Sequence, residues 1–194
     1  LILAFVGAVQ LQTFGATIYV ADLVGVAMVR DMGALITGIV MAGRSGAAFA
    51  AQLGSMKVTQ ETDALTTMAI SPMEFLVVPR VLALCLMMPL LTLYGDAMGV
   101  LGGGFVGLTM LDLSAMEYLR QTSTAVSLTD VAGGVLKGTV YGILIAISGC
   151  LRGMQSGKSS SAVGDAATSA VGTGIGSIII ACGMFAFVFY TLGI

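Results

Sequence analysis

Four ionisable residues lie inside long apolar stretches of this sequence, which is an unusual place for a charge. They are Arg30, Asp31, Asp96 and Lys137. A charged side chain within a membrane is costly and by default marks a functional site. Cations can hold a phosphate through charge-assisted hydrogen bonds while apolar walls accept acyl chains. These residues therefore predict a polar recess that binds a lipid.

The spacing places these residues at a similar depth. Arg30 and Asp31 fall about 11 Å into a helix that rises about 1.5 Å per residue, and Lys137 lies comparably deep in its own stretch. Three other interpretations stay open. The charges form a structural ion pair, Arg30 with Asp31 or Asp96, that locks helices together. Asp31 and Asp96 relay ions in a secondary transporter or channel, or the chain is a scaffold that transports nothing.

The elements that must position these residues are membrane helices. Hydrophobic residues make up 57% of the 194-residue chain and charged residues 9%, whereas a soluble domain carries about a quarter charged residues. Apolar windows long enough to span a bilayer fall at residues 1–20, 23–51, 75–111, 131–151 and 171–194. We therefore expect an all-α integral membrane protein with about five transmembrane helices.

Helix-start signals mark several edges of these windows. The segment 71–74 (Ser-Pro-Met-Glu) is a capping box with proline at the first helical position, so a helix is expected to begin there. Ser114 and Glu117 have the same spacing and predict a short helix between the third and fourth windows. Asp130 is expected to cap the fourth. The Gly/Ser-rich segment 152–169 is expected to be a flexible loop.

The distribution of basic residues predicts the orientation in the membrane. The connection between the second and third windows, with its flanks, holds Arg44, Lys57 and Arg80, and the connection between the fourth and fifth holds Arg152 and Lys158. The other two connections hold one such residue at most. Both basic connections are therefore expected in the cytoplasm, with the short helix and the C-terminus on the outer side.

Small residues recur every four positions in three of the windows. They are Gly38, Ala42, Gly46, Ala50 and Gly54 in the second, Gly95, Gly99, Gly103 and Gly107 in the third, and Gly134, Gly138, Gly142 and Ala146 in the fourth. Such stripes let helix backbones approach closely in lipid. They predict a tightly packed helix bundle.

Composition and motifs exclude several classes of function. A net charge of −2 excludes a basic nucleic-acid footprint, and the absence of histidine removes imidazole catalysis and histidine-based metal sites. The three cysteines form no C-x-x-C pair and are expected to be buried thiols. The segment 153–159 resembles a phosphate-binding loop, but Arg152 stands where the pattern needs its first glycine. We expect no catalytic residue, metal or cofactor in this chain.

Several short motifs follow one another in the first half of the chain. They are RDMG at 30–33, AGRSGAA at 42–48, GSMKVT at 54–59, DAL at 63–65, SP at 71–72 and VPR at 78–80. In this order and spacing they resemble the MlaE (YrbE-like) family of ABC transporter permeases. The resemblance covers essentially the whole chain and implies a single transmembrane permease domain over residues 1–194.

The resemblance also implies a function and a set of partners. Members of the family are homodimeric permeases of the bacterial inner membrane that move phospholipids or related lipids between that membrane and the outer envelope. ATP is bound and hydrolysed by a separate cytoplasmic ATPase, a periplasmic MCE-domain protein sits on the outer face, and some systems add a STAS-domain protein. An N-terminal interfacial helix that normally precedes the first span is expected to be missing here.

Individual residues take roles from the same resemblance. Arg30, Asp31 and Lys137 match positions that line the lipid pocket. Lys57 matches a position of the helix that couples the permease to its ATPase, and so do Glu61 and Asp63. This coupling helix is expected over residues 56–70, where no proline interrupts the chain.

Overall fold

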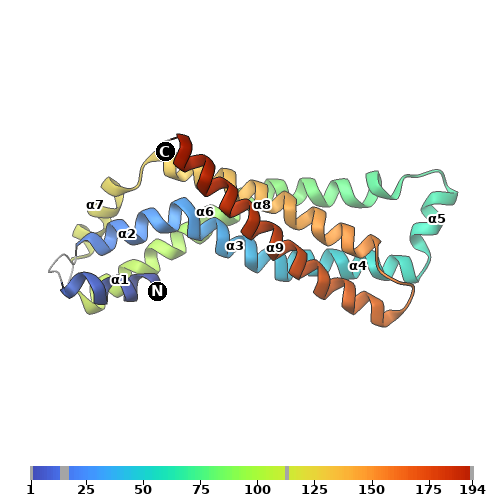
Figure 1. Ribbon diagram of the computed structural model, residues 1–194, viewed down its shortest axis with the longest axis horizontal. Coiled ribbons are helices and arrows are strands. Elements are labelled where there is room, and N and C mark those ends of the chain that lie inside the picture. The colour runs from blue at the N-terminus through green and yellow to red at the C-terminus, as the bar shows by residue number, and fades with distance from the viewer. Residues whose placement is uncertain (1, 14–17, 112–113, 193–194) are drawn as a thin grey trace. The chain divides into compact units, whose positions relative to one another are not determined.

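The computed structural model describes residues 2–13, 18–111 and 114–192, and it is built of helices (Figure 1). No strand occurs within these ranges. Four helical stretches within them are long and apolar enough to cross a membrane, namely Tyr19–Val58, Met73–Met110, Leu128–Met154 and Ser160–Thr191. The expected all-α membrane architecture is confirmed.

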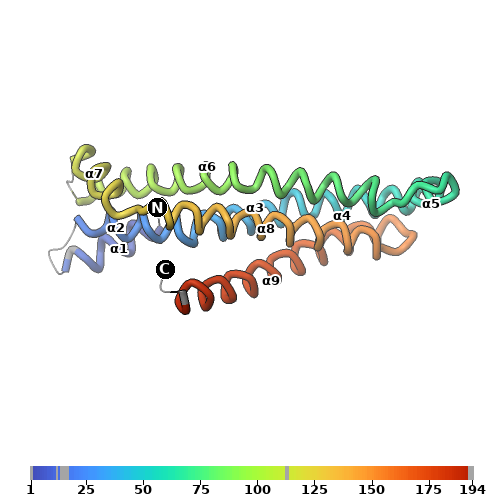
Figure 2. Tube along the Cα trace, turned by 90° about the horizontal axis from the view of Figure 1, so that it is seen from above, coloured from blue at the N-terminus to red at the C-terminus, as the bar shows by residue number. Residues whose placement is uncertain are grey.

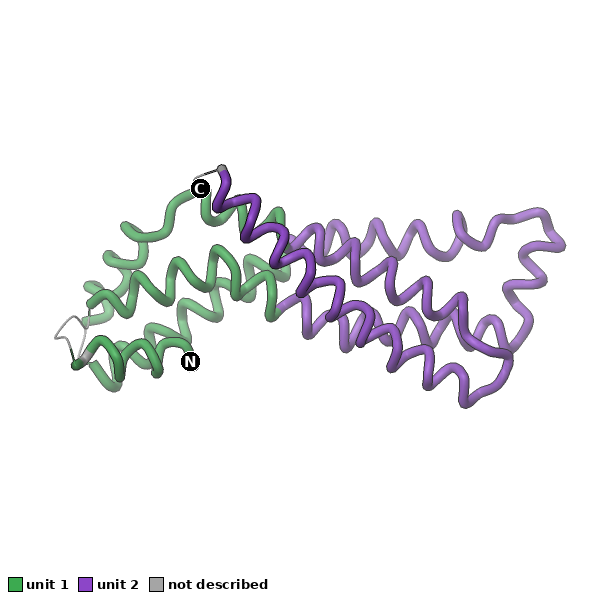
Figure 3. Tube along the Cα trace, in the orientation of Figure 1, with its two compact units in different colours: residues 1–36, 90–137 green, residues 37–89, 138–194 purple. Residues whose placement is uncertain are grey.

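The chain divides into two compact units (Figure 3). The first comprises residues 1–36 and 90–137, and the second comprises residues 37–89 and 138–194. The boundaries fall inside three helices, which are α3 (Gly33–Met41), α6 (Val78–Met110) and α8 (Leu128–Met154).

The first long stretch is a helix interrupted by two wider, π-helical turns. Along the chain it consists of α2 (Tyr19–Ala27), η1 (Met28–Met32), α3, η2 (Ala42–Gly46) and α4 (Ala47–Val58). A π turn bonds residue i to residue i+5, as the N–H of Gly33 does by donating to the carbonyl of Met28. Both π turns fall on motif segments of the sequence, and the hydrophobic pattern gave no sign of them.

The first apolar window, residues 1–20, is only partly described, because residues 1 and 14–17 lie outside the described ranges. The helix α1 spans Ile2–Thr13, and Tyr19 already belongs to the next helix. α1 is shorter than the roughly 20 residues that cross a bilayer. It packs against α2, and the core of the first unit contains Ala4, Ala8, Val20, Val24 and Val106.

In the second unit, α4 packs against α9 (Ser160–Leu192) (Figures 1 and 2). The small-residue stripe of the second window lies at the helix contacts of this unit. A Cβ atom built on Gly149 of α8 would lie only 2.7 Å from the carbonyl oxygen of Gly46, and both Ala42 and Ala50 are buried. Backbones that approach this closely leave no room for a side chain, as expected for helices packed in lipid.

The connection between α4 and α6 differs from the single helix expected over residues 56–70. α4 continues to Val58, and a separate short helix, α5, spans Glu61–Thr67 (Figure 2). Between them Gln60 adopts a left-handed conformation with φ of 62°. This conformation terminates a helix, so the expected coupling helix is shorter and begins later.

The Gly/Ser-rich segment 152–169 is not the flexible loop that its composition suggested. α8 continues to Met154, and α9 already begins at Ser160. The hydroxyl of Ser159 accepts a hydrogen bond from the N–H of Ala162 at 3.3 Å, which caps the start of α9. Small residues in the first turns of α9 serve helix packing, and Ala166 is buried.

The predicted helix starts are confirmed in two places and wrong in one. A helix begins with η3 (Met73–Val77) directly after Pro72, and α7 (Ala115–Ala125) follows Ser114. Asp130, however, does not cap α8. The N–H and hydroxyl of Ser127 donate to Asp130 Oδ2 at 3.1 and 2.6 Å, and the N–H of Asp130 donates to Ser127 Oγ at 3.3 Å. The cap is therefore Ser127, in a reciprocal capping box with Asp130.

The close contact between α8 and η2 can be tested with Gly149→Ala. The added methyl group would overlap the backbone of Gly46, so we expect the free energy of unfolding to fall by about 1–3 kcal/mol. Gly172→Ala in α9 is the matched control, because a Cβ atom there meets nothing within 4 Å. Thermal unfolding in detergent should show a lower midpoint for the first variant only. Equal midpoints would contradict the close backbone contact.

Candidate functional site

The candidate site lies in the first unit, where α8 packs directly on the π turn η1. A Cβ atom built on Gly134 of α8 would lie 2.1 Å from the carbonyl oxygen of Val29. Three residues further along α8, Lys137 lies on the same face of that helix. The missing side chain of Gly134 therefore lets the stem of Lys137 lie against the backbone of η1.

Lys137 is the charged centre of the site. The residue is only 1% exposed, and its ammonium donates a hydrogen bond to the carbonyl oxygen of Arg30 at 3.0 Å. It also forms a short salt bridge with Oδ1 of Asp31. A buried ammonium is tolerated only when it is paired and hydrogen-bonded. The cluster meets that condition with one backbone oxygen and one carboxylate from the same π turn.

The side chain of Arg30 takes a different partner. Its guanidinium lies 3.8 Å from Oδ1 of Asp130, near the start of α8. The same carboxylate completes the capping box with Ser127. We call Arg30, Asp31, Asp130 and Lys137 the ionic cluster. It contains as many acidic as basic side chains, and both of these ion pairs join η1 to α8.

The members of the ionic cluster differ strongly in exposure. The side chain of Asp31 is 46% exposed and that of Arg30 is 35% exposed, whereas Lys137 is buried. The accessible part of the cluster is thus one carboxylate beside one guanidinium. An arrangement of this kind can accept a hydrogen bond and donate several, so it can bind a polar group that carries both donors and an anion.

Asp96 of α6 lies apart from the ionic cluster. It is 6% exposed, and neither carboxylate oxygen has a hydrogen-bond partner among the residues that the structure describes. Its Oδ1 lies over Gly33, where a Cβ atom would be only 1.6 Å away. The structure thus brings together three of the four predicted site residues and places the fourth against the glycine that follows η1.

Two apolar cavities lie in the described part of the first unit. The one beside η1 has a volume of about 630 Å³ and the other about 330 Å³. The cavity beside η1 is lined by Met28 and Met32 of η1 together with Ile2, Leu3, Ile36, Met98, Gly99, Leu101 and Gly102. No member of the ionic cluster lines it. The π turn therefore presents charged residues toward α8 and methionines toward the apolar cavity.

The three residues predicted to contact an ATPase have different surroundings. Glu61 and Asp63 are exposed on α5. Lys57 is half-buried at the end of α4, and its ammonium donates hydrogen bonds to the carbonyl oxygens of Met154 and Ser156 at 2.9 and 2.7 Å. Its charge is thus directed toward the end of α8.

Sequence reasoning missed one member of the ionic cluster. Asp130 was expected only to cap a helix, and neither of the pairings considered for Arg30 included it. A signal was present, because Ser127 and Asp130 have capping-box spacing, which places Asp130 in the first turn of a helix. Asp130, Gly134 and Lys137 are then spaced by four and three residues and share one helix face.

The contact between Gly33 and Asp96 makes a specific prediction. Gly33→Ala should lower the thermal midpoint by several degrees, because the methyl group overlaps the Asp96 carboxylate. Adding Asp96→Ala should restore most of the loss, since it removes both the overlap and an unpartnered buried carboxyl. Thermal unfolding of the two single variants and the double variant in detergent gives the interaction energy between the two substitutions. Additive effects would contradict this contact.

Known proteins similar to this chain are permeases. The family model described as "Permease MlaE" matches residues 1–188. A probable ABC transporter permease protein of Rickettsia typhi is 41% identical over 170 residues, which cover 88% of this chain and 66% of the relative. A probable ABC transporter permease protein of Synechocystis is 35% identical over 86% of this chain and 64% of its own length.

A plant protein is also similar. The chloroplastic protein Trigalactosyldiacylglycerol 1 of Arabidopsis thaliana is 32% identical over 162 residues, which cover 84% of this chain and 46% of the relative. The chain thus spans a little under two thirds of the length of the bacterial relatives it matches. Its long apolar helices make it a multi-pass membrane protein, and the match over nearly its whole length shows that it belongs to the MlaE permease family.

Proposed function

We propose that this chain is the membrane-spanning permease of an ATP-driven ABC transporter that moves phospholipids or related lipids. It works as a homodimer in the bacterial inner membrane and transfers lipid between that membrane and the outer envelope. A separate cytoplasmic ATPase supplies the energy, and a periplasmic MCE-domain protein, with a STAS-domain protein in some systems, completes the assembly. The permease itself is a transport subunit and not an enzyme.

The ionic cluster is the observation that carries this proposal. The half-exposed guanidinium of Arg30 is suited to the phosphate of a lipid headgroup. The half-exposed carboxylate of Asp31 is suited to the amine or hydroxyl groups of the same headgroup. Lys137 is buried and bonds to the carboxylate of Asp31. It therefore contributes to the site by orienting the Asp31 side chain.

The apolar cavity of about 630 Å³ beside η1 supports a lipid cargo. Methionine side chains are flexible and fill irregular apolar space, so Met28 and Met32 can adapt to acyl chains of different shape. A phospholipid has one charged end and two apolar chains. The same π turn offers charged groups on one side and an apolar cavity on another, which matches that chemistry.

The names of the relatives support the same proposal. The Rickettsia and Synechocystis proteins are named as probable ABC transporter permeases, and such a permease needs an ATPase partner. The Arabidopsis relative is named after trigalactosyldiacylglycerol, which is a glycolipid. Exposed Glu61 and Asp63 on α5 provide an acidic contact for the ATPase.

A second candidate, an ion-coupled transporter that uses intramembrane carboxylates, has one observation in its favour. Asp96 is a buried carboxyl group whose oxygens lack a hydrogen-bond partner within the described part of the chain. The other carboxylate of that candidate, Asp31, is paired with Lys137. An ion-coupled transporter would work without an ATPase, and this difference separates the two candidates.

The lipid site can be tested by removing the charges of one ion pair together. Lys137→Ala alone leaves the half-exposed carboxylate of Asp31 without its partner and should destabilise the protein by about 1–3 kcal/mol, the cost of losing one hydrogen-bond partner. The double variant Asp31→Asn with Lys137→Met removes both charges and should unfold near the wild-type temperature. We expect it to lose most of the phospholipid that copurifies with the wild type, measured by mass spectrometry.

The matched control for this experiment is Lys158→Met, which removes an exposed lysine of the turn between α8 and α9. It should keep its lipid. If the double variant is stable and retains wild-type lipid, the ionic cluster is a structural lock between η1 and α8 and the proposed headgroup site is wrong.

The ATPase contact can be tested with Glu61→Arg combined with Asp63→Arg. We propose that the ATPase offers a basic surface to α5, so that reversing two exposed charges on α5 replaces attraction by repulsion. We expect the ATPase to copurify with the wild type and to be lost from the variant, while the permease still unfolds at its usual temperature. An ATPase that binds both forms equally would argue against α5 as its contact. Transport that proceeds without any ATPase would favour the ion-coupled candidate.

A further inference from the structure

Lys57 joins the end of one helix to the end of another within the second unit. It lies in the last turn of α4, which ends at Val58. Its ammonium donates to the carbonyl oxygen of Met154, the last residue of α8, at 2.9 Å, and to that of Ser156, in the following turn, at 2.7 Å. The side chain therefore bridges α4 and the turn between α8 and α9.

The carbonyl group of Met154, at the end of α8, is a group that needs a donor. The last carbonyl groups of a helix have no partner within the helix, and they carry the negative end of its dipole. An ammonium has three donors and a full positive charge, so hydrogen bonds from it are stronger than neutral ones. Lys57 thus fixes the position of the C-terminus of α8.

The surrounding helices are packed too closely to slide past one another. A Cβ atom built on Gly153 of α8 would lie 2.8 Å from the Cβ of Leu53 and 2.9 Å from the carbonyl oxygen of Ala50. A Cβ atom built on Gly54 of α4 would meet Ser156 Oγ at 3.2 Å and Val163 of α9 at 3.4 Å. The ends of α4 and α8 thus lie side by side, and the hydrogen bonds of Lys57 add a polar link between them.

The short helix α5 follows this contact almost directly. The N–H of Gln60 donates to the carbonyl oxygen of Lys57 at 3.3 Å, and the N–H of Ala64 in α5 donates to the carbonyl oxygen of Gln60 at 3.0 Å. Only Thr59 and Gln60 separate α4 from α5. A force applied to α5 thus reaches Lys57 through a short, hydrogen-bonded turn.

We propose that Lys57 is a positioning residue that transmits movement of α5 to the C-terminus of α8. The inference rests on the proposed function, in which an ATPase acts on α5. In this role Lys57 does not itself contact the ATPase. We call the two hydrogen bonds from Lys57 to the carbonyl oxygens of Met154 and Ser156 the clamp. Lys137 of the ionic cluster lies on the same helix, α8.

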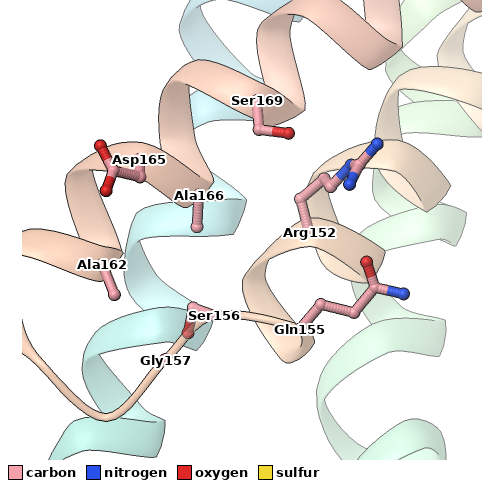
Figure 4. A pocket seen from close by; sticks show the side chains of 8 residues that line it. All are labelled: Arg152, Gln155, Ser156, Gly157, Ala162, Asp165, Ala166 and Ser169. Atoms are coloured by element: carbon pink, nitrogen blue, oxygen red, sulfur yellow. The ribbon is translucent and has the colours of Figure 1, made fainter.

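The turn held by Lys57 has room to move. Gln155, Ser156 and Gly157 line a polar recess of about 310 Å³ together with Arg152 and residues of α9 (Figure 4). In Figure 4 the side chains of Arg152 and Asp165 point away from each other, and no ion pair closes the recess between them. The turn thus borders this recess on one side and packs against α4 on the other.

The test compares three variants of the full protein, assembled with its ATPase in nanodiscs. Lys57→Met removes the ammonium and keeps the apolar stem, Lys57→Arg restores a cation with several donors, and Lys158→Met is the control on the same turn. We expect Lys57→Met to assemble and hydrolyse ATP but to move about tenfold less phospholipid per ATP, a size typical of lost coupling between sites. Lys57→Arg and Lys158→Met should keep most of the wild-type ratio.

Amide hydrogen exchange of the unassembled protein gives a second measurement that does not depend on transport. The N–H groups of Gln155 and Ser156 are hydrogen-bonded to carbonyl oxygens of α8, and they should exchange several-fold faster in Lys57→Met than in Lys158→Met. If Lys57→Met fails to assemble, Lys57→Gln, which keeps a donor without the charge, takes its place.

The outcomes separate the clamp from the proposed function. If Lys57→Met leaves both the amount of phospholipid moved per ATP and the amide hydrogen exchange unchanged, the role proposed for Lys57 is wrong. The proposal of lipid transport is unaffected by that result. A wild-type complex that moves no phospholipid overturns the proposed function, and hydrogen exchange then decides whether Lys57 fixes the turn. Faster exchange together with a lower ratio, both restored in Lys57→Arg, supports the clamp.

Discussion

A lysine ammonium that is almost completely buried must be satisfied by its neighbours, and the packing of η1 against α8 supplies what Lys137 needs. The carbonyl oxygen of Arg30 and the carboxylate of Asp31 both come from one π turn. Gly134 lets α8 approach the backbone of that turn closely enough for the lysine to reach it. Because an unpaired charge is so costly away from water, these contacts must form together or not at all. The consequence for function is that Asp31 and Arg30 are held in place while remaining half-exposed.

The two ends of α8 carry different tasks. Its first turns contain Asp130, which pairs with Arg30, and Lys137 follows two turns later. Its last carbonyl group, that of Met154, accepts a hydrogen bond from Lys57. Lys57 itself lies at the end of α4, directly before the turn that leads to α5. Close packing through glycine makes both contacts possible, because helices in lipid associate through small residues and shape more than through hydrophobic burial. In our account, one helix therefore contributes residues both to the candidate lipid site and to the contact with Lys57.

Much of this organisation could be predicted from the sequence, and the failures have physical causes. Hydrophobic windows predicted the long helices because length and composition alone decide whether a helix can cross a bilayer. Arg30, Asp31, Asp96 and Lys137 were expected to converge because they fall at a similar depth in their helices, and the structure brings together all of them except Asp96. Which acid pairs with which base was not predictable. Asp130 becomes a possible partner for Arg30 only when α8 packs on η1. The π turns, the left-handed Gln60 and the early start of α9 at Ser160 depend on single residues and local hydrogen bonds, to which averaged hydropathy is insensitive.

The central claim is that the accessible part of the ionic cluster binds a lipid headgroup. A structure of the assembled transporter in a phospholipid bilayer tests it most directly, because it locates lipid phosphorus relative to named side chains. Our account predicts a headgroup within hydrogen-bond distance of Arg30 or Asp31, with Lys137 still buried beneath them. It would be contradicted by a structure in which Arg30 and Asp31 contact only protein or acyl chains while the headgroup of the bound lipid lies against other residues.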